Sequence, residues 1–499
     1  MSLMAGGELG SRSSGLVPLK YRRVGGSVLL TSAFGDWVMV SEDELRALQA
    51  GPVDPGSALG RRLHERRFLA GLIDPSTLAS RHREKKRFLR YGPNLHVMVV
   101  TLRCNETCVY CHASRAPMDR TDTDMSKETA ERTVEMALRS TSPRITIEFQ
   151  GGEPLANFPV IQHIIETALE KNRAVGKELE FTLVSNLSLM TDERLDYLVS
   201  RRVQICTSVD GPQDLHNKQR VLPSGNAWQA AAVWIQRIND RYRAAGLDPV
   251  LYHVEALLTT TRAALERPRE IVDTYVELGC HAIFLRPVDP FGFASMTASR
   301  IEYERKRYLD FYREAVDYIL ELNARGTQVL ERFASIFLTK ILTGDDPNYL
   351  DIRSPCGAGI GQVAYDHDGS IFTCDEGRMM HQMGDDTFKI GELGTSSYRE
   401  LMTHETVRAL LVASNLDAQP DCVDCVYQPY CGVCPVHSYA TQGSIHGRMR
   451  ESHLCAVHKG IQDYLFEKLG ANDPVLDATF RRWTTVRERS HFVHQTCAS

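Results

Sequence analysis

The sequence predicts an α/β protein built on a parallel β-sheet, because short apolar runs alternate with amphipathic helical segments between residues 94 and 290. The helical spacing of apolar residues is clearest in KETAERTVEMALRS and FPVIQHIIETALEKN. The six expected strands are LHVMVVTLR, RITIEFQGG, LEFTLVSNL, VQICTSVDG, LYHVEALLT and AIFLRPVD. Such a sheet is curved or doubly wound, and both forms place their sites at the carboxyl ends of the strands. The residues at these ends are Cys104, Gly151, Asn186, Asp210 and Arg286.

The regions on either side of this block divide the chain further. Residues 1–90 contain no cysteine and predict a small α+β domain, with two strands in VLLTSAFGDWVMV and a following helix capped by Ser41 and Glu44. The basic run RHREKKRFLR then predicts a solvated connector. The remaining expected parts are the α/β block at 91–300, a helical bridge at 301–349 with its helix at 303–326, a cysteine-rich block with little periodic pattern at 350–460, and a tail at 461–499.

Composition narrows the class of protein. The 499 residues carry a formal charge of −5, with 43% hydrophobic and 24% charged residues, which is typical of a globular chain and argues against nucleic acid as the main partner. No run is long and apolar enough for a membrane span, and the first residues contain no secretory signal. The 13 cysteines are odd in number and clustered, which favours metal binding over disulfides. We therefore expect a cytoplasmic metalloprotein.

The first cysteine cluster is CNETCVYC, directly after the first strand of the α/β block. Cys104, Cys108 and Cys111 provide three thiolates, whereas a [4Fe–4S] cluster normally takes four, so one iron would stay open for a substrate or cosubstrate. The alternative is a zinc site, which needs a fourth nearby ligand. His112 is the available candidate, but it is adjacent to Cys111 and poorly placed to join the same tetrahedron.

The CxxxCxxC spacing, with Tyr110 before its last cysteine and GGEPL at the end of the next strand, resembles the radical S-adenosylmethionine (SAM) superfamily. This resemblance implies a partial (β/α)6 TIM-type barrel and a [4Fe–4S] cluster that binds SAM and generates a 5′-deoxyadenosyl radical. It also implies SAM contacts from Gly151, Gly152, Glu153 and Pro154 in GGEP, from Ser185, Asn186, Ser208 and Asp210 at later strand ends, and from Arg220 to the SAM carboxylate. The alternative for these polar residues is that they only cap strand ends and turns.

The second cysteine region resembles the SPASM extension, the auxiliary-cluster domain of radical SAM enzymes that modify peptides and proteins. Its cysteines are Cys356, Cys374, Cys422, Cys425, Cys431, Cys434 and Cys455. The usual CxxCxxxxxCxxxC core is shortened here, since only Gly432 and Val433 separate the last pair. The resemblance implies two auxiliary [4Fe–4S] clusters, one on Cys422, Cys425, Cys431 and Cys455, and the other on Cys356, Cys374 and Cys434. The second cluster would have an open iron or a ligand such as His or Asp. A zinc ribbon is the alternative. The remaining Cys206, Cys280 and Cys497 are expected to be buried or incidental.

The stretches HVMVVTLRCNETCVYC, RITIEFQGGEPLANFP and GAGIGQVAYDHDGSIFTCDEGRMM resemble the His-Xaa-Ser-system radical SAM maturases, which act on ribosomally made precursor peptides. The resemblance implies oxidative cross-linking of peptide side chains, with an auxiliary cluster taking the surplus electron and a flavodoxin or ferredoxin as reductant. Formylglycine-type oxidation, with Asp375 as base, and epimerisation are the alternatives within the class; a zinc-binding or electron-relay protein is the alternative outside it. The block at 21–90 would bind a leader peptide as an added strand near 28–32 or 36–40, or would merely cap the barrel.

Overall fold

The computed structural model describes the chain except for residues 1–7, 10–14, 73, 348–349 and 496–499. Its central feature is a ten-stranded sheet in the order β13-β12-β11-β9-β8-β7-β5-β14-β15-β16. Six of its strands are those expected from the sequence: β5 (Leu95–Val99), β7 (Arg144–Gln150), β8 (Glu178–Val184), β9 (Gln204–Ser208), β11 (Glu255–Thr260) and β12 (Ala282–Pro287). All six are parallel and follow one another without reversal. The sheet is therefore the curved, barrel-like form, and the doubly wound alternative is wrong.

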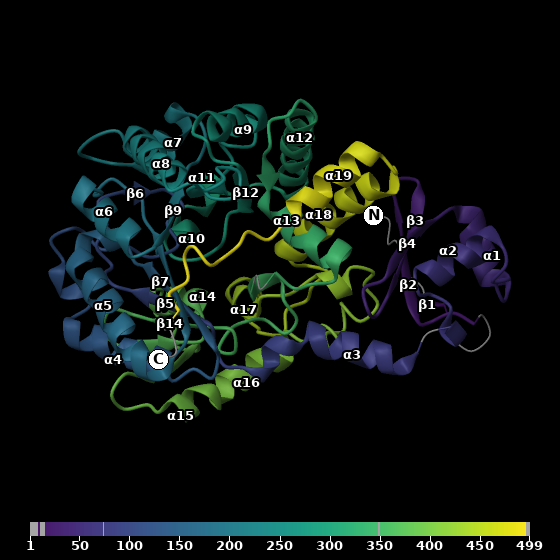
Figure 1. Ribbon diagram of the computed structural model, residues 1–499, viewed down its shortest axis with the longest axis horizontal. Coiled ribbons are helices and arrows are strands. Elements are labelled where there is room, and N and C mark those ends of the chain that lie inside the picture. Colours follow the sequence, from purple (N-terminus) through teal and green to yellow (C-terminus); the bar gives the residue numbers. More distant parts are fainter. Residues whose placement is uncertain (1–7, 10–14, 73, 348–349, 496–499) are drawn as a thin grey trace.

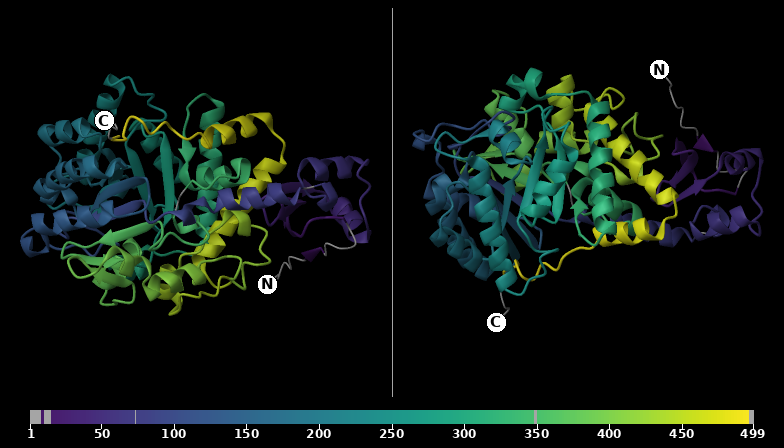
Figure 2. Two further views of the ribbon diagram at one scale, coloured as in Figure 1. Left: turned by 60° about the horizontal axis from the view of Figure 1, so that its bottom comes forward. Right: turned by 90° about the horizontal axis from the view of Figure 1, so that it is seen from above.

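Helices cover the outer side of this sheet, as Figures 1 and 2 show. They are α4 (Lys127–Leu138), α5 (Phe158–Val175), α6 (Asp192–Ser200), α7 (Gln213–Gln219), α8 (Ala227–Ala244), α9 (Pro268–Glu277) and α12 (Arg305–Ala324). Helix α12 lies within the helix expected at 303–326, and it packs on the barrel with the others. Short helices α10 (Phe293–Met296) and α11 (Ala298–Ile301) and helix α13 (Arg332–Leu338) complete this part, with edge strand β13 (Leu330–Glu331).

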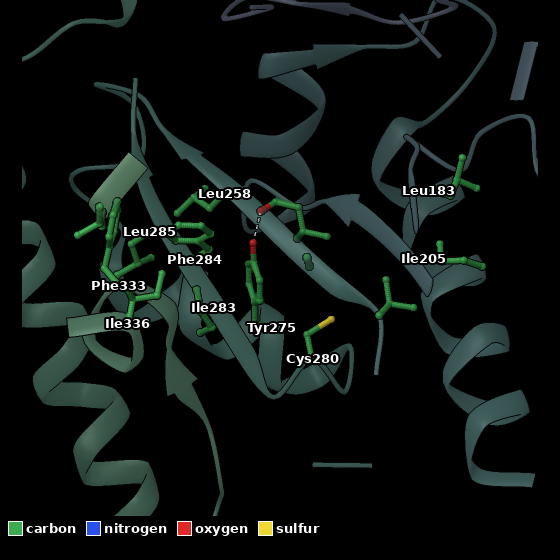
Figure 3. Packing of buried hydrophobic residues seen from close by; sticks show 14 of the residues in the cluster. Leu183, Ile205, Leu258, Tyr275, Cys280, Ile283, Phe284, Leu285, Phe333 and Ile336 are labelled. Carbon is green, nitrogen blue, oxygen red and sulfur yellow. Dashed lines mark hydrogen bonds between the residues drawn. The ribbon is translucent and has the colours of Figure 1, made fainter. Parts of the chain in front are cut away.

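The core between sheet and helices consists of apolar side chains that alternate along the strands. Figure 3 shows this packing around Leu258, Ile283 and Leu285, each fully buried. Tyr275 of α9 also lies here, and its hydroxyl donates to Val209 O at 2.7 Å. Cys280 is 1% exposed in the same cluster and serves as a small apolar side chain, as expected. Cys497 lies outside the described residues.

The N-terminal part is an antiparallel sheet in the order β1-β2-β3-β4, at one end of the molecule in Figure 1. Its strands are β1 (Glu8–Leu9), β2 (Leu19–Val24), β3 (Ser27–Ser32) and β4 (Trp37–Val40), followed by α1 (Glu42–Ala50), α2 (Ala58–Glu65) and α3 (Pro75–Lys85). The two expected strands and the Ser41–Glu44 capping box are present. The basic run is not simply a solvated connector, because Lys85 Nζ donates to Pro429 O at 2.7 Å and Lys86 reaches Ser354 O.

The cysteine-rich block contains more regular structure than its sequence pattern predicts. Strand β14 (Gln362–Tyr365) pairs parallel with β5, so this block extends the barrel sheet directly. The other elements are β15 (Ser370–Phe372), β16 (Lys389–Glu392), α14 (Asp375–Gln382), α15 (Tyr398–Met402), α16 (Glu405–Ala413) and α17 (Pro435–Gln442). Helices α18 (His453–Gly470) and α19 (Pro474–Trp483) lie between the N-terminal sheet and the barrel in Figure 1. The elements from β14 to α17 were missed in the sequence because they are short and because their buried positions include cysteines and polar residues.

Candidate functional site

The first three cysteines lie in one loop at the carboxyl end of β5. A short antiparallel pair holds this loop, since β6 (Thr107–Cys108) pairs with β10 (Arg220–Val221), and this pairing sets Arg220 opposite Cys108. Polar donors point at the thiols: the Glu106 N–H lies 3.4 Å from Cys104 Sγ, and Arg220 Nη1 lies 3.7 Å from Cys108 Sγ. Burial raises the pKa of Cys104 to about 12. Burial alone would keep these thiols neutral. The donors that point at them suit thiolates, which is the form that binds iron.

The two glycines of GGEP lock this loop to the end of β7. A Cβ on Gly151 would lie 2.3 Å from Thr101 O, and a Cβ on Gly152 would lie 2.3 Å from Leu102 O. The space left by the missing side chains is used by hydrogen bonds, from Gly152 N–H to Thr101 O at 2.9 Å and from Glu153 N–H to Arg103 O at 2.7 Å. The close approach that these glycines permit is therefore one of backbone to backbone, which positions the cysteine loop.

Glu153 joins three strand ends. Its fully buried carboxylate accepts from the Ser185 hydroxyl at 2.8 Å, from Asn186 N–H at 2.7 Å and from Leu155 N–H at 3.0 Å. Burial raises the pKa of Glu153 to about 7. Pro154 is also buried and opens the short helix after it. Asn186 Nδ2 continues the network to Asn105 Oδ1 at 3.1 Å, so the β8 end is tied to the cysteine loop.

A second buried network surrounds Arg220. Both carboxylate oxygens of Asp210 lie 2.6 Å from the Tyr110 hydroxyl, and Arg220 Nε lies 3.3 Å from Asp210. The Arg220 guanidinium also stacks 5.2 Å from the Tyr110 ring centre and lies 3.6 Å from Glu106. Tyr110, Asp210 and Arg220 thus come together as expected, but with one another as partners. Their contacts with SAM, and that of Ser208 at the end of β9, remain predictions.

Sequence reasoning missed Glu106, which is 2% exposed between Cys104 and Cys108. Burial raises the pKa of its carboxyl group. Its position inside CNETCVYC was a usable signal, because an acidic residue within a buried cluster loop needs a cationic partner, and Arg220 supplies it.

The cysteines of the second region separate into two groups, which we name the four-thiol site (Cys422, Cys425, Cys431 and Cys455) and the three-thiol site (Cys356, Cys374 and Cys434). The members of the four-thiol site line one pocket, and each interacts electrostatically with others of the group. The members of the three-thiol site share one buried cluster. Cys434 also lines the pocket of the four-thiol site, so the two groups are neighbours. The division into two cluster sites and the ligand roles stay proposals.

Two helix starts point at the three-thiol site. Cys374 Sγ accepts from Gly377 N–H at 3.4 Å at the start of α14, and Cys434 Sγ accepts from His437 N–H at 3.4 Å at the start of α17. Helix N-termini favour thiolates. Gly432 permits the short spacing before Cys434, because a Cβ there would lie 2.4 Å from Arg353 N. Across the described residues, no three His, Cys, Asp or Glu side chains lie close enough together to hold a single metal ion.

Asp375 begins α14, immediately after Cys374. Its Oδ1 accepts from Arg378 Nε at 2.8 Å, and both residues are buried. Arg378 also interacts electrostatically with Cys111, and Asp375 with Glu148 of β7, so the pair lies between the first cysteine loop and the barrel strands. Within the described chain, Arg378 Nη1 is buried without a hydrogen-bond partner. The arrangement offers a fixed carboxylate and a free donor beside the first cysteine loop.

Comparison with known proteins agrees with this geometry. Residues 98–254 match the family model of the radical SAM superfamily. This part of the chain is therefore a radical SAM domain, and the expected barrel, [4Fe–4S] cluster and SAM binding are properties of that superfamily. In the described residues, no helix has the length and apolar character needed to cross a membrane.

Individual relatives and solved structures are similar to this chain beyond the matched domain. The chain is 22% identical over 397 residues to a serine-type anaerobic sulfatase-maturating enzyme of Bacteroides thetaiotaomicron, covering 74% of this chain and 88% of the relative. It is 21% identical over 379 residues to a cysteine-type enzyme of Clostridium perfringens, covering 73% and 94%. The solved structure of anSMEcpe with bound AdoMet has a TM-score of 0.62 at 19% identity, covering 78% and 99%. Streptococcus suis SuiB bound to precursor peptide SuiA has a TM-score of 0.51 at 14% identity, covering 87% and 98%. The chain is thus similar over most of its length to sulfatase-maturating enzymes, and its fold is similar to that of SuiB.

Proposed function

We propose that this enzyme cross-links side chains of a ribosomally made precursor peptide, of the kind that the sequence resemblance to His-Xaa-Ser-system maturases indicates. One contact carries the proposal: the loop after β12 joins the two cysteine regions. Ala294 N–H donates to Cys111 O at 3.3 Å, while Phe291 packs in the buried cluster of the three-thiol site. A peptide at the strand ends would therefore lie between the first cysteine loop and the second cysteine region.

The bound cluster and SAM would supply a radical that removes a hydrogen atom from the peptide. Cys104, Cys108 and Cys111 would hold this cluster, and the two thiol sites would hold auxiliary [4Fe–4S] clusters. The chain's own residues hold the strand ends in place and keep water out of the site. Glu153 fixes three strand ends. The buried Tyr110–Asp210–Arg220 network closes the wall of the site. A flavodoxin or ferredoxin is the proposed reductant, since SAM cleavage needs electrons of low potential.

Asp375 is the proposed proton acceptor, with Arg378 as its positioning residue. The 2.8 Å contact between them fixes the carboxylate at the start of α14. We expect Asp375→Asn to reduce peptide modification at least tenfold while 5′-deoxyadenosine release continues. Asp386→Asn, just after α14 and with its side chain 67% exposed, is the matched control. Equal loss of both products in Asp375→Asn would contradict a role in proton transfer.

The N-terminal sheet is the proposed binding site for the leader peptide. Strand β3 is central in that sheet, so the expected addition near 28–32 is wrong, whereas β4 (Trp37–Val40) is an edge strand. At this edge, Arg62 Nη2 already donates to Met39 O at 3.0 Å, so the Met39 main chain faces away from β3. A leader peptide would displace the Arg62 side chain from Met39 O and pair with β4 as an added strand.

Met39→Pro removes one edge N–H, and Met39→Ala keeps it while removing the same side chain, so the two form a matched pair. We expect the proline variant to weaken peptide binding at least tenfold in fluorescence anisotropy, with affinity retained in the alanine variant. SAM cleavage without peptide should be unchanged in both. Equal affinities in the two variants would refute addition at β4.

Formylglycine-type oxidation is the second candidate, because the sulfatase-maturating relatives cover most of this chain. Oxidation of serine to formylglycine and formation of one cross-link each remove two hydrogens, so peptide mass alone does not separate them. A hydrazide reagent does, since it labels an aldehyde and leaves a cross-link unlabelled.

The test is anaerobic co-expression of the enzyme with a candidate peptide, taken from any short open reading frame beside its gene, followed by intact-mass analysis. Cross-linking predicts a loss of two hydrogens per modification, no hydrazide labelling, and fragment ions missing between the joined residues. The Cys104→Ala, Cys108→Ala, Cys111→Ala variant should leave the peptide unchanged. Hydrazide labelling would favour formylglycine. Unchanged mass with uptake of solvent deuterium would show epimerisation and overturn cross-linking.

A further inference from the structure

The three-thiol site lacks a fourth cysteine. Cys356, Cys374 and Cys434 are 3%, 1% and 7% exposed and share a cluster with Phe291 and Met380. Among the described cysteines, the four-thiol site uses its own four, the first loop uses three, and Cys206 and Cys280 belong to the barrel. A [4Fe–4S] cluster normally takes four protein ligands. The described chain therefore offers this site three thiols and requires a different kind of fourth donor.

Two carboxylates face these thiols, and we name them the carboxylate pair. Asp351 lies in the short helical turn Leu350–Ile352, five positions before Cys356, and Glu376 lies in the first turn of α14, two positions after Cys374. Asp351, Glu376 and Cys434 line the same small pocket. Glu376 hydrogen bonds with the Cys374 side chain. The charges of both carboxylates also act on Cys356 and Cys434.

Both carboxylates of the pair are partly exposed, and they interact electrostatically with each other. Arg286, on the same pocket, acts on Asp351 as a cation and also lies 3.4 Å from Asp289. The neighbouring charges of Asp351 and Asp375 that act on Glu376 have the same sign as its own. Carboxylate oxygen is an ordinary iron ligand, so a cluster on the three thiols would have oxygen donors beside it.

The histidines of the pocket fit less well. His437 and His458 also line it, but the His437 ring packs edge-on against Phe291 with 6.4 Å between the ring centres. The charged group that acts on His437 is Asp289 rather than a member of the three-thiol site. The carboxylate pair, in contrast, interacts with all three thiols.

We propose that the cluster of the three-thiol site takes its fourth protein ligand from the carboxylate pair. This inference rests on the auxiliary clusters of the proposed function. An oxygen ligand makes one iron chemically distinct from the other three and more easily exchanged. It also gives this cluster a higher reduction potential than a cluster held by four thiolates, because replacing thiolate by a weaker donor raises the potential.

The test uses the full chain carrying Cys104→Ala, Cys108→Ala and Cys111→Ala, so that only auxiliary clusters remain, with Mössbauer and EPR spectroscopy as readouts. We expect the parent to show one distinct iron subsite in half of its clusters. The Asp351→Asn, Glu376→Gln double variant should lose that iron on mild oxidation and give a three-iron EPR signal, and the single variants identify the ligand. Glu405→Gln, an exposed acidic residue of the same block, is the matched control and should match the parent.

The four-thiol site is the internal check on folding, since its signal should persist in every variant. A double variant with the parent's spectrum would overturn the inference, and so would a parent without a cluster at the three-thiol site. In a parallel assay, the chain with Cys104, Cys108 and Cys111 intact is tested for peptide modification. An unmodified peptide there counts against the proposed function, while the spectra still decide the ligand.

Discussion

Gly152→Ala tests directly whether GGEP positions the first cysteine loop. The new Cβ would lie 2.3 Å from Leu102 O and 2.5 Å from Arg103 O, and both neighbours are backbone atoms that cannot rotate away. Such overpacking typically costs about 1–3 kcal/mol. The two hydrogen bonds between this turn and the loop, from Gly152 and Glu153, would be strained or lost at about 1 kcal/mol each. The expected loss is therefore about 3–5 kcal/mol, concentrated where the loop meets the end of β7.

The assay is iron and sulfide content of the reconstituted protein, with the melting temperature and the yield of 5′-deoxyadenosine. We expect Gly152→Ala to lose the first cluster and SAM cleavage while both auxiliary clusters remain. Gly225→Ala is the matched control, because its Cβ would meet only Leu222 Cδ2 at 3.8 Å, an ordinary contact. Full loading of the first site, with the melting temperature of the wild type, would refute the reasoning.

Two further predictions concern stability. His96 is buried, and burial lowers its pKa from 6.5 to about 4, so the unfolded chain binds more protons between these pH values; the free energy of unfolding should fall by at most about 3 kcal/mol as the pH drops through this window. Urea titrations at pH 7 and pH 4.5 should show a smaller fall for His96→Gln, and an identical fall would contradict this assignment. Asp210→Asn leaves the buried Arg220 cation with Glu106 at 3.6 Å as its carboxylate partner and should cost about 3 kcal/mol in metal-free protein. An unchanged midpoint of urea unfolding in Asp210→Asn would show that the Asp210 charge does not stabilise the fold.

Much of the barrel could be predicted because its strands are short stretches with alternating buried apolar residues, as in RITIEFQ, separated by amphipathic helical segments. The resemblance to the SPASM extension implied which thiols group together, and that grouping stays a prediction. The same reasoning could not find β14, whose pairing with β5 joins residues more than 260 positions apart. It also could not show that Tyr110, Asp210 and Arg220 are partners of one another, since their contacts depend on how three separate strand ends meet.

The carboxylate pair also could not be predicted from the sequence. Asp351 and Glu376 are ordinary acidic residues in sequence, and Glu376 stands next to Asp375, for which a role was expected. Only the fold brings Asp351 and Glu376 to one pocket with Cys434. The sequence indicated that a fourth donor was missing, and the structure indicates which residues stand in its place.

The central claim is that a radical generated at Cys104, Cys108 and Cys111 modifies a peptide. The most direct measurement is the ratio of 5′-deoxyadenosine to modified peptide in an anaerobic reaction with purified enzyme, SAM, reductant and the candidate peptide. The account predicts equal amounts of the two products when peptide is in excess, and neither product from the triple alanine variant. Modified peptide formed by that variant, or formed without 5′-deoxyadenosine, would contradict the account.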